Sequence, residues 1–334
     1  MRAYRLTMGG GIDGIVAVEE PEPTAGPGQV KVRVRATSLN YRDLGMVRNP
    51  RQGAIVPLSD GAGEVVEVGA GVTRWKAGDR VMGCFFPYWE DGPVTPEHTR
   101  ASLGGVTTDG MLAEQVVLPE GAVVRTPEHL TDVEASALPC AALTAWNSMF
   151  EAYKLVPGAT VLLLGTGGVS IAGLQFAQAA GARTIITSSS DEKLEQVADM
   201  GADDTVNYKD DPDWEQQVLK LTDGRGVDLV LEVGGEATFA KSMAATRIGG
   251  HIASIGGLGR VDENAPRLPM IGRNAEVVRM AVGSRAMFER MNRAIEHRQI
   301  HPVVDRVFGF NVAQDAYRYL QSQQHIGKIV ITIA

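Results

Sequence analysis

The stretch VLLLGTGGVSIAGLQFAQAAGARTIITSSSDEKLEQ, residues 161–196, begins with an apolar strand that runs into a glycine-rich turn and then a helix of small residues. This order of elements is typical of a turn that holds the pyrophosphate of a dinucleotide. Gly165 permits the tight turn, and Gly167 permits the close approach of a pyrophosphate to the helix N-terminus. Ser170 replaces the third glycine of the usual fingerprint, and we expect it only to relax the packing of helix against strand.

Beyond this stretch, apolar strands alternate with helical segments. Such alternation favours right-handed crossovers around a parallel sheet and predicts a doubly wound dinucleotide-binding fold. Within it we expect Gly181 to end one helix, and Ser189 with Glu192 to form a capping box for the next. The predicted strands are Thr160–Leu164, Arg183–Ser188, Thr205–Tyr208, Val227–Val233, His251–Gly256 and Glu276–Val282.

The first part of the chain, up to about residue 125, has a different pattern. In QVKVRVRATS, residues 29–38, valines alternate with basic residues, as in a half-buried antiparallel strand. Further short strands separated by Gly, Asp and Pro predict a sandwich or barrel. After a helix near the end of the chain, the apolar strands PVVDRVFGF and GKIVITIA resemble the short strands of this first part. We therefore expect a β-rich domain of residues 1–127 and 285–334, split by a dinucleotide-binding domain of residues 128–284.

The composition is that of a globular chain with room for two domains. Its 334 residues are 44% hydrophobic and 22% charged, with a net charge of -8. This charge offers no general attraction to nucleic acid or anionic membranes, and no run approaches the roughly 20 apolar residues that span a bilayer. Cys84 and Cys140 are too few for a disulfide framework. We expect a cytoplasmic protein that binds neither nucleic acid nor membrane.

Several stretches of the chain form a recognisable set: SLNYRDL at residues 38–44, PLSDGAGEVVEVGAGV at residues 57–72, KAGDRVMG, ALPCAALTAW, GTGGVS and GGHIASIGG. Together they resemble the medium-chain dehydrogenase/reductase superfamily over essentially the whole length, and in particular its zinc-free branch of quinone oxidoreductases and enoyl reductases. The resemblance implies an α/β chain with a GroES-like β-rich catalytic domain and a Rossmann cofactor domain. It also implies a homodimer that pairs through Glu276–Val282.

The resemblance bears on metal binding as well. Zinc-dependent relatives take one cysteine ligand from the segment matching SLNYRDL, a histidine from the one matching PLSDGAG, and commonly a cysteine from the one matching ALPCAAL. Here Asn40 and Asp43 lie in the first segment, Ser59 replaces the histidine, and Cys140 alone remains. One thiolate cannot supply the three protein ligands of a catalytic zinc. We therefore expect no metal site and a structural role for Cys140.

Without a metal, the protein must polarise its substrate with hydrogen bonds, which suits hydride transfer to a quinone or an α,β-unsaturated carbonyl. By resemblance the catalytic candidates are Asn40, Tyr41 and Asp43. Asn40 would donate through its amide and Tyr41 through its hydroxyl, while Asp43 orients them. An equally weighted alternative makes Tyr41 an aromatic wall beside the nicotinamide.

The end of the second predicted strand indicates which nicotinamide cofactor is bound. An acidic residue there would bind the ribose 2′-hydroxyl of NAD, but Ser188 and Ser189 occupy the place, and Lys193 and Tyr208 match positions that bind phosphate in NADPH-dependent relatives. Asp191 and Glu192 add nearby negative charge, so we expect a preference for NADPH with NADH still accepted. The resemblance implies further cofactor contacts from Thr144, Gly165, Thr166, Gly167, Gly168, Val169, Val233, Ile255, Gly256 and Val282.

Two other functions stay open at this point. One is a metal-independent alcohol or aldehyde oxidoreductase, and the other is a nucleotide-binding or structural relative with no catalysis. The substrate pocket is equally open, because the aromatic residues of CFFPYWEDGP, residues 84–93, either line an apolar pocket or cover the barrel.

Overall fold

A computed structural model describes residues 1–7, 10–48, 54–257 and 274–333. The chain forms two compact units, one of Met1–Leu143 with Val282–Ala334 and the other of Thr144–Ala281. The first unit therefore takes in residues 128–143 and 282–284, beyond the boundaries expected from the sequence. The reason is that this segment is bound to the β-rich part: Arg80 pairs with Asp132 at 2.7 Å, and the Ser38 hydroxyl donates to the Ser136 carbonyl.

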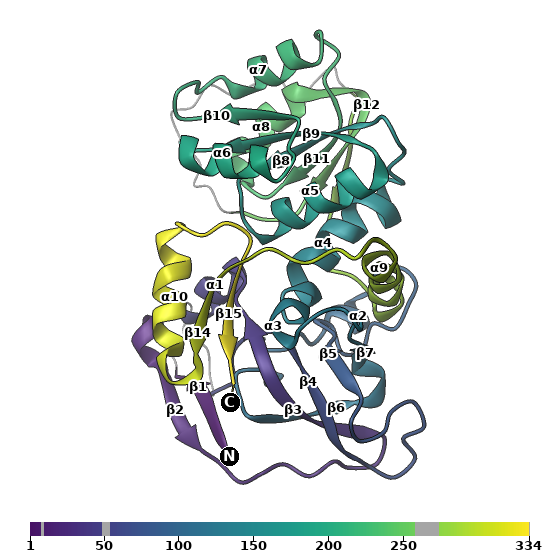
Figure 1. The fold of residues 1–334 in the computed structure, drawn as a ribbon, viewed down its shortest axis with the longest axis vertical. Coiled ribbons are helices and arrows are strands. Elements are labelled where there is room, and N and C mark those ends of the chain that lie inside the picture. Colours follow the sequence, from purple (N-terminus) through teal and green to yellow (C-terminus); the bar gives the residue numbers. More distant parts are fainter. Residues whose placement is uncertain (8–9, 49–53, 258–273, 334) are drawn as a thin grey trace. The chain divides into compact units, whose positions relative to one another are not determined.

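The second unit contains a six-stranded sheet in the order β10-β9-β8-β11-β12-β13, and every neighbouring pair is parallel (Figure 1). This order confirms the doubly wound fold, because the chain starts in the middle of the sheet and builds first one side and then the other. The strands are β8 (Thr160–Leu164), β9 (Arg183–Ser188), β10 (Asp204–Asn207), β11 (Val227–Glu232), β12 (Thr246–Ser254) and β13 (Glu276–Arg279).

Four helices of this unit connect the strands: α5 (Gly168–Ala180), α6 (Asp191–Asp199), α7 (Trp214–Leu221) and α8 (Glu236–Ala245). Gly181 ends α5 with a φ of 72°, as predicted. The predicted capping box at the start of α6 is wrong by one residue, because the Ser190 hydroxyl accepts the Lys193 N–H instead. Three successive serines offer the same capping chemistry, and the backbone turn decides among them.

The first unit is built on a seven-stranded sheet in the order β14-β15-β3-β4-β5-β7, with β6 also paired to β3, and on the separate pair β1–β2. The predicted alternation in β3 is confirmed, since Val30, Val32, Val34 and Ala36 are all buried. The strands are β1 (Arg2–Leu6), β2 (Ile15–Glu19), β3 (Gln29–Ser38), β4 (Asp60–Val68), β5 (Arg80–Gly83), β6 (Gln115–Pro119), β7 (Val123–Arg125), β14 (Val304–Gly309) and β15 (Lys328–Thr332).

Strand β15 pairs antiparallel with β3 and places the start of one strand beside the end of the other. Val330 lies opposite Ser38, and the Leu39 N–H donates to the Ile329 carbonyl at 3.0 Å. Helix α1 (Tyr41–Arg48) begins directly after this junction. The remaining helices of the unit are α2 (Pro96–Thr99), α3 (Asp132–Ala135), α9 (Arg285–Arg298) and α10 (Ala313–Ser322), and the short α4 (Leu143–Trp146) begins at the boundary between the units.

Candidate functional site

The glycine-rich turn between β8 and α5 is open enough to receive a ligand. Gly165 has a φ of 72°, and a Cβ built on Gly165 or Gly167 would meet no other atom within 4 Å. Gly167 precedes α5 without a side-chain cap from the described residues, so no side chain there takes up the first N–H groups of the helix. These features fit a pyrophosphate, which binds backbone N–H groups at a helix N-terminus.

Ser170 does more than relax the packing, so the expectation for this residue was wrong. Its side chain is buried, and its hydroxyl donates to the Leu164 carbonyl at 2.6 Å, which ties the first turn of α5 to the end of β8. The close contact of helix and sheet is made at Gly173. A Cβ there would lie 2.8 Å from Leu231 Cδ1 and 2.9 Å from Leu163 Cδ2.

Most of the other predicted cofactor residues follow the carboxyl ends of the parallel strands, where ligands of doubly wound folds bind, but Thr144 and Val282 do not. The Tyr208 N–H donates to the Ser188 carbonyl at 3.0 Å, and the Ile255 N–H donates to the Glu232 carbonyl at 2.8 Å. Thr144 is buried in α4, while Val282 belongs to the first unit. The glycine turn contains Thr166, and the first turn of α5 contains Gly168 and Val169. Val233 follows β11 directly, and Gly256 lies just beyond the end of β12.

The end of β9 presents hydroxyl groups of different accessibility. Ser188 is only 4% exposed, Ser189 is half-buried, and Tyr208 is 41% exposed. The nearby Asp191 carboxylate accepts a hydrogen bond from the Asn207 amide at 2.7 Å, so its charge is directed toward β10. Lys193, in the first turn of α6, is half-buried. The strand end therefore carries no carboxylate of its own.

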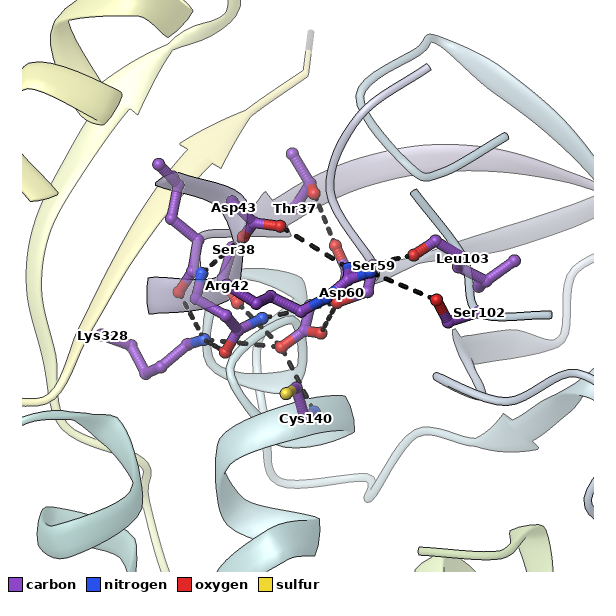
Figure 2. Close-up of polar contacts among 12 residues, drawn as sticks. Thr37, Ser38, Arg42, Asp43, Ser59, Asp60, Ser102, Leu103, Cys140 and Lys328 are labelled. Carbon is purple, nitrogen blue, oxygen red and sulfur yellow. Dashed lines mark hydrogen bonds and ion pairs between the residues drawn. The ribbon is translucent and has the colours of Figure 1, made fainter. Parts of the chain in front are cut away.

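A buried polar cluster lies in the first unit, where β3, α1, β4 and β15 meet (Figure 2). At its centre the Lys328 ammonium donates to the Leu39 carbonyl at 2.7 Å and to Asn40 Oδ1 at 2.7 Å, and it lies 3.4 Å from Asp60 Oδ2. The Lys328 side chain is 6% exposed and the Asp60 side chain is fully buried. We call Asn40, Asp60 and Lys328 the Asn40–Lys328 cluster.

The Asp60 carboxylate is held by groups from several elements. Its Oδ1 accepts the Ser59 hydroxyl at 2.7 Å, and its Oδ2 accepts the Cys140 N–H at 3.3 Å in addition to the Lys328 ammonium. A buried ion pair is tolerated only when hydrogen bonds satisfy the remaining polar atoms, as they do here. The cluster is therefore a fixed arrangement with opposite charges matched inside the protein.

Asn40 occupies the position before α1, where an asparagine side chain commonly caps a helix. Its described side-chain contacts lie elsewhere, with Lys328 through Oδ1 and with Ser59 Oγ at 3.5 Å through Nδ2. Asp43 holds the Asn40 backbone instead, since its Oδ2 accepts the Asn40 N–H at 2.7 Å. The predicted orienting role of Asp43 thus has a geometric basis. The Asn40 side-chain amide does not cap α1 and contacts Lys328 and Ser59 instead.

Asp43 is buried, and its Oδ1 has no hydrogen-bond partner among the described residues. Burial raises the pKa of the Asp43 carboxyl to about 6, while the Arg42 guanidinium, 3.7 Å away, and the Asn40 N–H act in the opposite direction. Tyr41 is half-buried and packs against the hydrophobic core of the unit. Both expected roles of Tyr41, the hydroxyl donor and the aromatic wall beside the nicotinamide, stay predictions.

The residues at the positions of the zinc ligands do come together, but they do not fit a zinc ion. Asn40, Ser59 and Cys140 surround Asp60, and the Lys328 ammonium already supplies the positive charge between them. Burial raises the pKa of the Cys140 thiol well above its usual range, and Asp60 adds to this effect, so the thiol stays neutral. In the described part of the chain, no group of three His, Cys, Asp or Glu residues is suited to hold a metal.

The aromatic segment that follows β5 is divided between core and surface. Phe85 and Trp89 are buried, and the Phe85 ring lies under the Arg42 guanidinium at 4.8 Å. Tyr88 is exposed and lies beneath Arg100 at 4.5 Å. Burial alone does not decide between the two alternatives, so lining a pocket and covering the barrel both stay predictions for these residues.

Sequence reasoning missed Lys328 and Asp60 as members of the site. The available signal was a lysine at the start of an apolar strand, KIVIT, and an aspartate at the start of another, DGAGEVVEV. Charged residues are almost never fully buried unless they are paired. The pattern indicates that each needs a partner, but the two residues lie 268 positions apart and nothing in the sequence joins them.

Comparison with known proteins now adds to this geometry. Residues 26–128 match the family model of the alcohol dehydrogenase GroES-like domain, and residues 168–297 match that of zinc-binding dehydrogenases. A zinc-type alcohol dehydrogenase-like protein of Schizosaccharomyces pombe is 46% identical over 317 residues, which cover 92% of this chain and 91% of the relative. The chain belongs to the medium-chain dehydrogenase/reductase superfamily.

Solved structures of this superfamily agree in fold over the whole chain. An NAD-dependent alcohol dehydrogenase has a TM-score of 0.91 at 32% identity, with 100% of both chains covered. A mycobacterial protein solved with NADPH has a TM-score of 0.83 at 26% identity, again with 100% of both chains covered. Within the described ranges, no helix is both long and apolar enough to cross a lipid bilayer.

Proposed function

We propose that this protein is an NADPH-dependent oxidoreductase that transfers hydride to a quinone or an α,β-unsaturated carbonyl without a metal ion. The observation that carries the proposal is the Lys328 ammonium, which lies where Asn40, Ser59 and Cys140 converge at the positions of the family's zinc ligands. A divalent cation added there would be repelled by the ammonium. The Asn40 amide is then the group left to polarise a substrate.

A neutral amide donor suits an acceptor that is already activated. When bound, the nicotinamide supplies the hydride. The Asn40 amide carries two N–H donors on Nδ2, and the one described contact of Nδ2 is the 3.5 Å approach to Ser59 Oγ. We therefore assign it the hydrogen bond to the substrate oxygen, where negative charge develops. Conjugated ketones and quinones spread that charge, so they need less stabilisation than an isolated carbonyl.

The preference for NADPH rests on the end of β9. Ser188 and Ser189 leave out the carboxylate that would repel a 2′-phosphate, and Lys193 and Tyr208 lie after β9 and β10 at the same edge of the sheet. The Asp191 carboxylate accepts a hydrogen bond from the amide of Asn207, which pairs with Ser188 in the sheet, so its charge weakens this preference without abolishing it. The same fold is solved with NADPH in one relative and named NAD-dependent in another, so the protein's own side chains carry this part of the proposal.

Names of other relatives support the substrate class. A quinone oxidoreductase-like protein of Nematostella vectensis is 26% identical over 347 residues, and a solved 2-haloacrylate reductase has a TM-score of 0.79 at 27% identity. Both names describe reduction of an activated acceptor. The names of more similar relatives, one a zinc-type alcohol dehydrogenase-like protein and one an NAD-dependent alcohol dehydrogenase, favour alcohol or aldehyde chemistry. The second candidate is therefore an alcohol or aldehyde oxidoreductase, which we propose in its metal-independent form because of Lys328.

One assay series separates these functions. Purified protein, dialysed against a chelator and analysed for zinc, is followed by nicotinamide absorbance with a benzoquinone, an enone, an aldehyde and an alcohol, each with both cofactors. We expect turnover of the quinone or enone, a higher kcat/KM with NADPH, and rates unchanged by chelation. Activity restored only by zinc, or turnover confined to alcohol and aldehyde, contradicts the proposal. Tight cofactor binding without any turnover favours a protein that binds nucleotide only.

We also propose that two copies pair through β13. This strand is the last in the order of the sheet and pairs with β12 on one side, and Val277 on it is 44% exposed. An exposed strand edge is a template for pairing with another chain. Light scattering should report a dimer for the wild type and a monomer for Val277→Pro, and a wild-type monomer would contradict the pairing.

A further inference from the structure

We infer that Lys328 is a positioning residue, whose ammonium fixes the Asn40 amide so that Nδ2 is presented to the substrate oxygen. The inference rests on the proposed function, in which Asn40 is the donor. It concerns a residue at the start of β15, far from the rest of the site in sequence, and the contact that joins it to Asn40 spans 288 positions.

The Asn40 amide can face Lys328 in only one way. The Lys328 ammonium lies 2.7 Å from the side-chain oxygen of Asn40. An ammonium has only donors, whereas an amide has one end that accepts and one end that donates. The carbonyl end must therefore face Lys328, and the NH₂ end must face away from it. The oxygen and nitrogen of an asparagine amide are often hard to tell apart, but here an ammonium partner requires the oxygen.

The Lys328 side chain is itself held by several contacts. Its ammonium also donates to the Leu39 carbonyl at 2.7 Å and lies 3.4 Å from the Asp60 carboxylate, so its three N–H groups have partners. Its backbone N–H donates to the Val303 carbonyl at 3.0 Å. Both ends of the side chain are thus fixed, and the ammonium points only at protein atoms.

Asn40 has further contacts that hold it in place. Asp43 holds its backbone N–H, which frees the side chain from capping α1, and Ser59 lies beside Nδ2 while donating its own proton to Asp60. Lys328 is therefore the group that holds the carbonyl end. A hydrogen bond from a cation also polarises the amide and strengthens its N–H as a donor. Because the ammonium is buried and fully engaged, Lys328 acts through Asn40 and does not itself contact the substrate.

The experiment is a double-mutant cycle with Lys328→Met and Asn40→Ala, assayed on whichever substrate the wild type reduces best. Losing the position of a donor lowers kcat by about 100-fold, so we expect about a 10- to 100-fold fall for Lys328→Met with cofactor affinity unchanged. The double variant should be no slower than Asn40→Ala alone. Lys328→Arg should recover part of the rate. Additive losses, or wild-type kcat in Lys328→Met, would overturn the inference.

Two further variants control for folding. Lys328→Met leaves the Asp60 carboxylate buried without its cation, so the paired variant Lys328→Met with Asp60→Asn removes both charges and should show the same fall in kcat. Lys31→Met removes the Lys31–Glu67 ion pair on β3, away from Asn40, and should leave kcat unchanged. If the paired variant folds and turns over at the wild-type rate, Lys328 has no positioning role.

A crystal structure of each variant gives a readout that needs no turnover. In Lys328→Met the Asn40 amide should leave its wild-type orientation, and its carbonyl should turn away from position 328. An unmoved Asn40 would overturn the inference even if the protein proves to act on alcohols or on nothing. Failure of the proposed function, by contrast, appears in the substrate panel of the wild type and leaves this result unaffected.

Discussion

Polar groups are open to a ligand in the glycine turn of the second unit, whereas they are buried and paired in the Asn40–Lys328 cluster of the first. The turn leaves backbone N–H groups at the start of α5 open, with empty space above Gly165 and Gly167. The cluster buries an ammonium and a carboxylate and satisfies both within the protein. The N–H groups of the glycine turn need a ligand as their hydrogen-bond partner. The charged groups of the cluster have their partners within the protein, and we assign only the Asn40 amide to the substrate.

This difference explains what each region can tolerate. An open backbone site depends on small residues, because any side chain would occupy the space of the ligand. A buried charge pair depends on every member, because removal of one leaves its partner unpaired in a low dielectric. The predictions that follow test this contrast.

The largest effect is expected for Asn40→Ala. Loss of one positioned donor typically costs about 100-fold or more in kcat, and NADPH affinity should stay unchanged because Asn40 belongs to the other unit. Steady-state kinetics with a quinone or enone and fluorescence titration of NADPH are the measurements. Asn311→Ala, at an exposed asparagine of the same unit, is the matched control. Wild-type kcat in Asn40→Ala would remove it from the mechanism.

Asp43 should make the stability of the protein depend on pH between about 4 and 6. The folded protein holds its proton up to a pKa of about 6, whereas the ordinary value is 3.8, so between these values the folded state binds more protons. The free energy of unfolding should therefore fall by on the order of 2–3 kcal/mol as pH rises through this interval. Urea unfolding at several pH values, compared between the wild type and Asp43→Asn, isolates the effect.

The Asp43→Asn variant is needed because the pKa of another carboxyl group, Asp228, is shifted in the opposite direction and changes stability with pH in the opposite sense. Burial raises the pKa of Asp228, but hydrogen bonds from Arg225, the Thr160 N–H and Arg247 outweigh this and lower it to about 2. Its contribution is present above the ordinary pKa and is lost in more acidic solution. If Asp43→Asn and the wild type show parallel stability curves between pH 4 and 6, Asp43 is ionised throughout.

A pair of glycine variants should separate binding from packing within one helix. Gly173→Ala places a Cβ against Leu231 and Leu163 and should cost about 1–3 kcal/mol of stability, measured by urea unfolding. Gly167→Ala meets no neighbouring atom and should leave stability nearly unchanged. It should weaken NADPH binding about 10-fold, or about 1.4 kcal/mol, because the methyl group fills the space of the pyrophosphate. Equal effects of both variants on stability would contradict this division.

The smallest effect is expected at the end of β9. Ser189→Asp adds a carboxylate at the more accessible serine and should shift the ratio of kcat/KM for NADPH over NADH toward NADH by about 10-fold. Ser189→Asn, similar in shape and uncharged, should leave the ratio near the wild-type value. Ser188→Asp should shift it in the same direction, with an added loss of stability because Ser188 is buried. A ratio that no aspartate moves would mean that this edge does not bind the phosphate.

The two regions also differed in how well they could be predicted. Strands β8 and β9 were placed with their observed ends, and the cofactor turn was identified, because strand, turn and helix follow one another in the sequence. The role of Ser170 and the cap at Ser190 were missed, since both depend on backbone geometry that several residues satisfy equally.

In the cluster, Asn40 and Asp43 were found by resemblance, but Lys328 and Asp60 were not. Their pairing depends on how β15 lies against β3 and β4, which no local pattern contains. The likeness to zinc-dependent relatives directed attention to missing ligands, whereas the structure shows a cation of the protein's own between the residues that replace them.

The place of β15 in the sheet has a consequence for the order in which the protein can form during synthesis. The second unit is one continuous stretch, Thr144–Ala281, so it can fold as soon as that stretch has left the ribosome. The first unit must wait, because β14 and β15 are made only after the whole second unit, and β15 brings Lys328. A nascent chain released before residue 328 would carry a folded nucleotide fold beside a first unit that lacks its central cation.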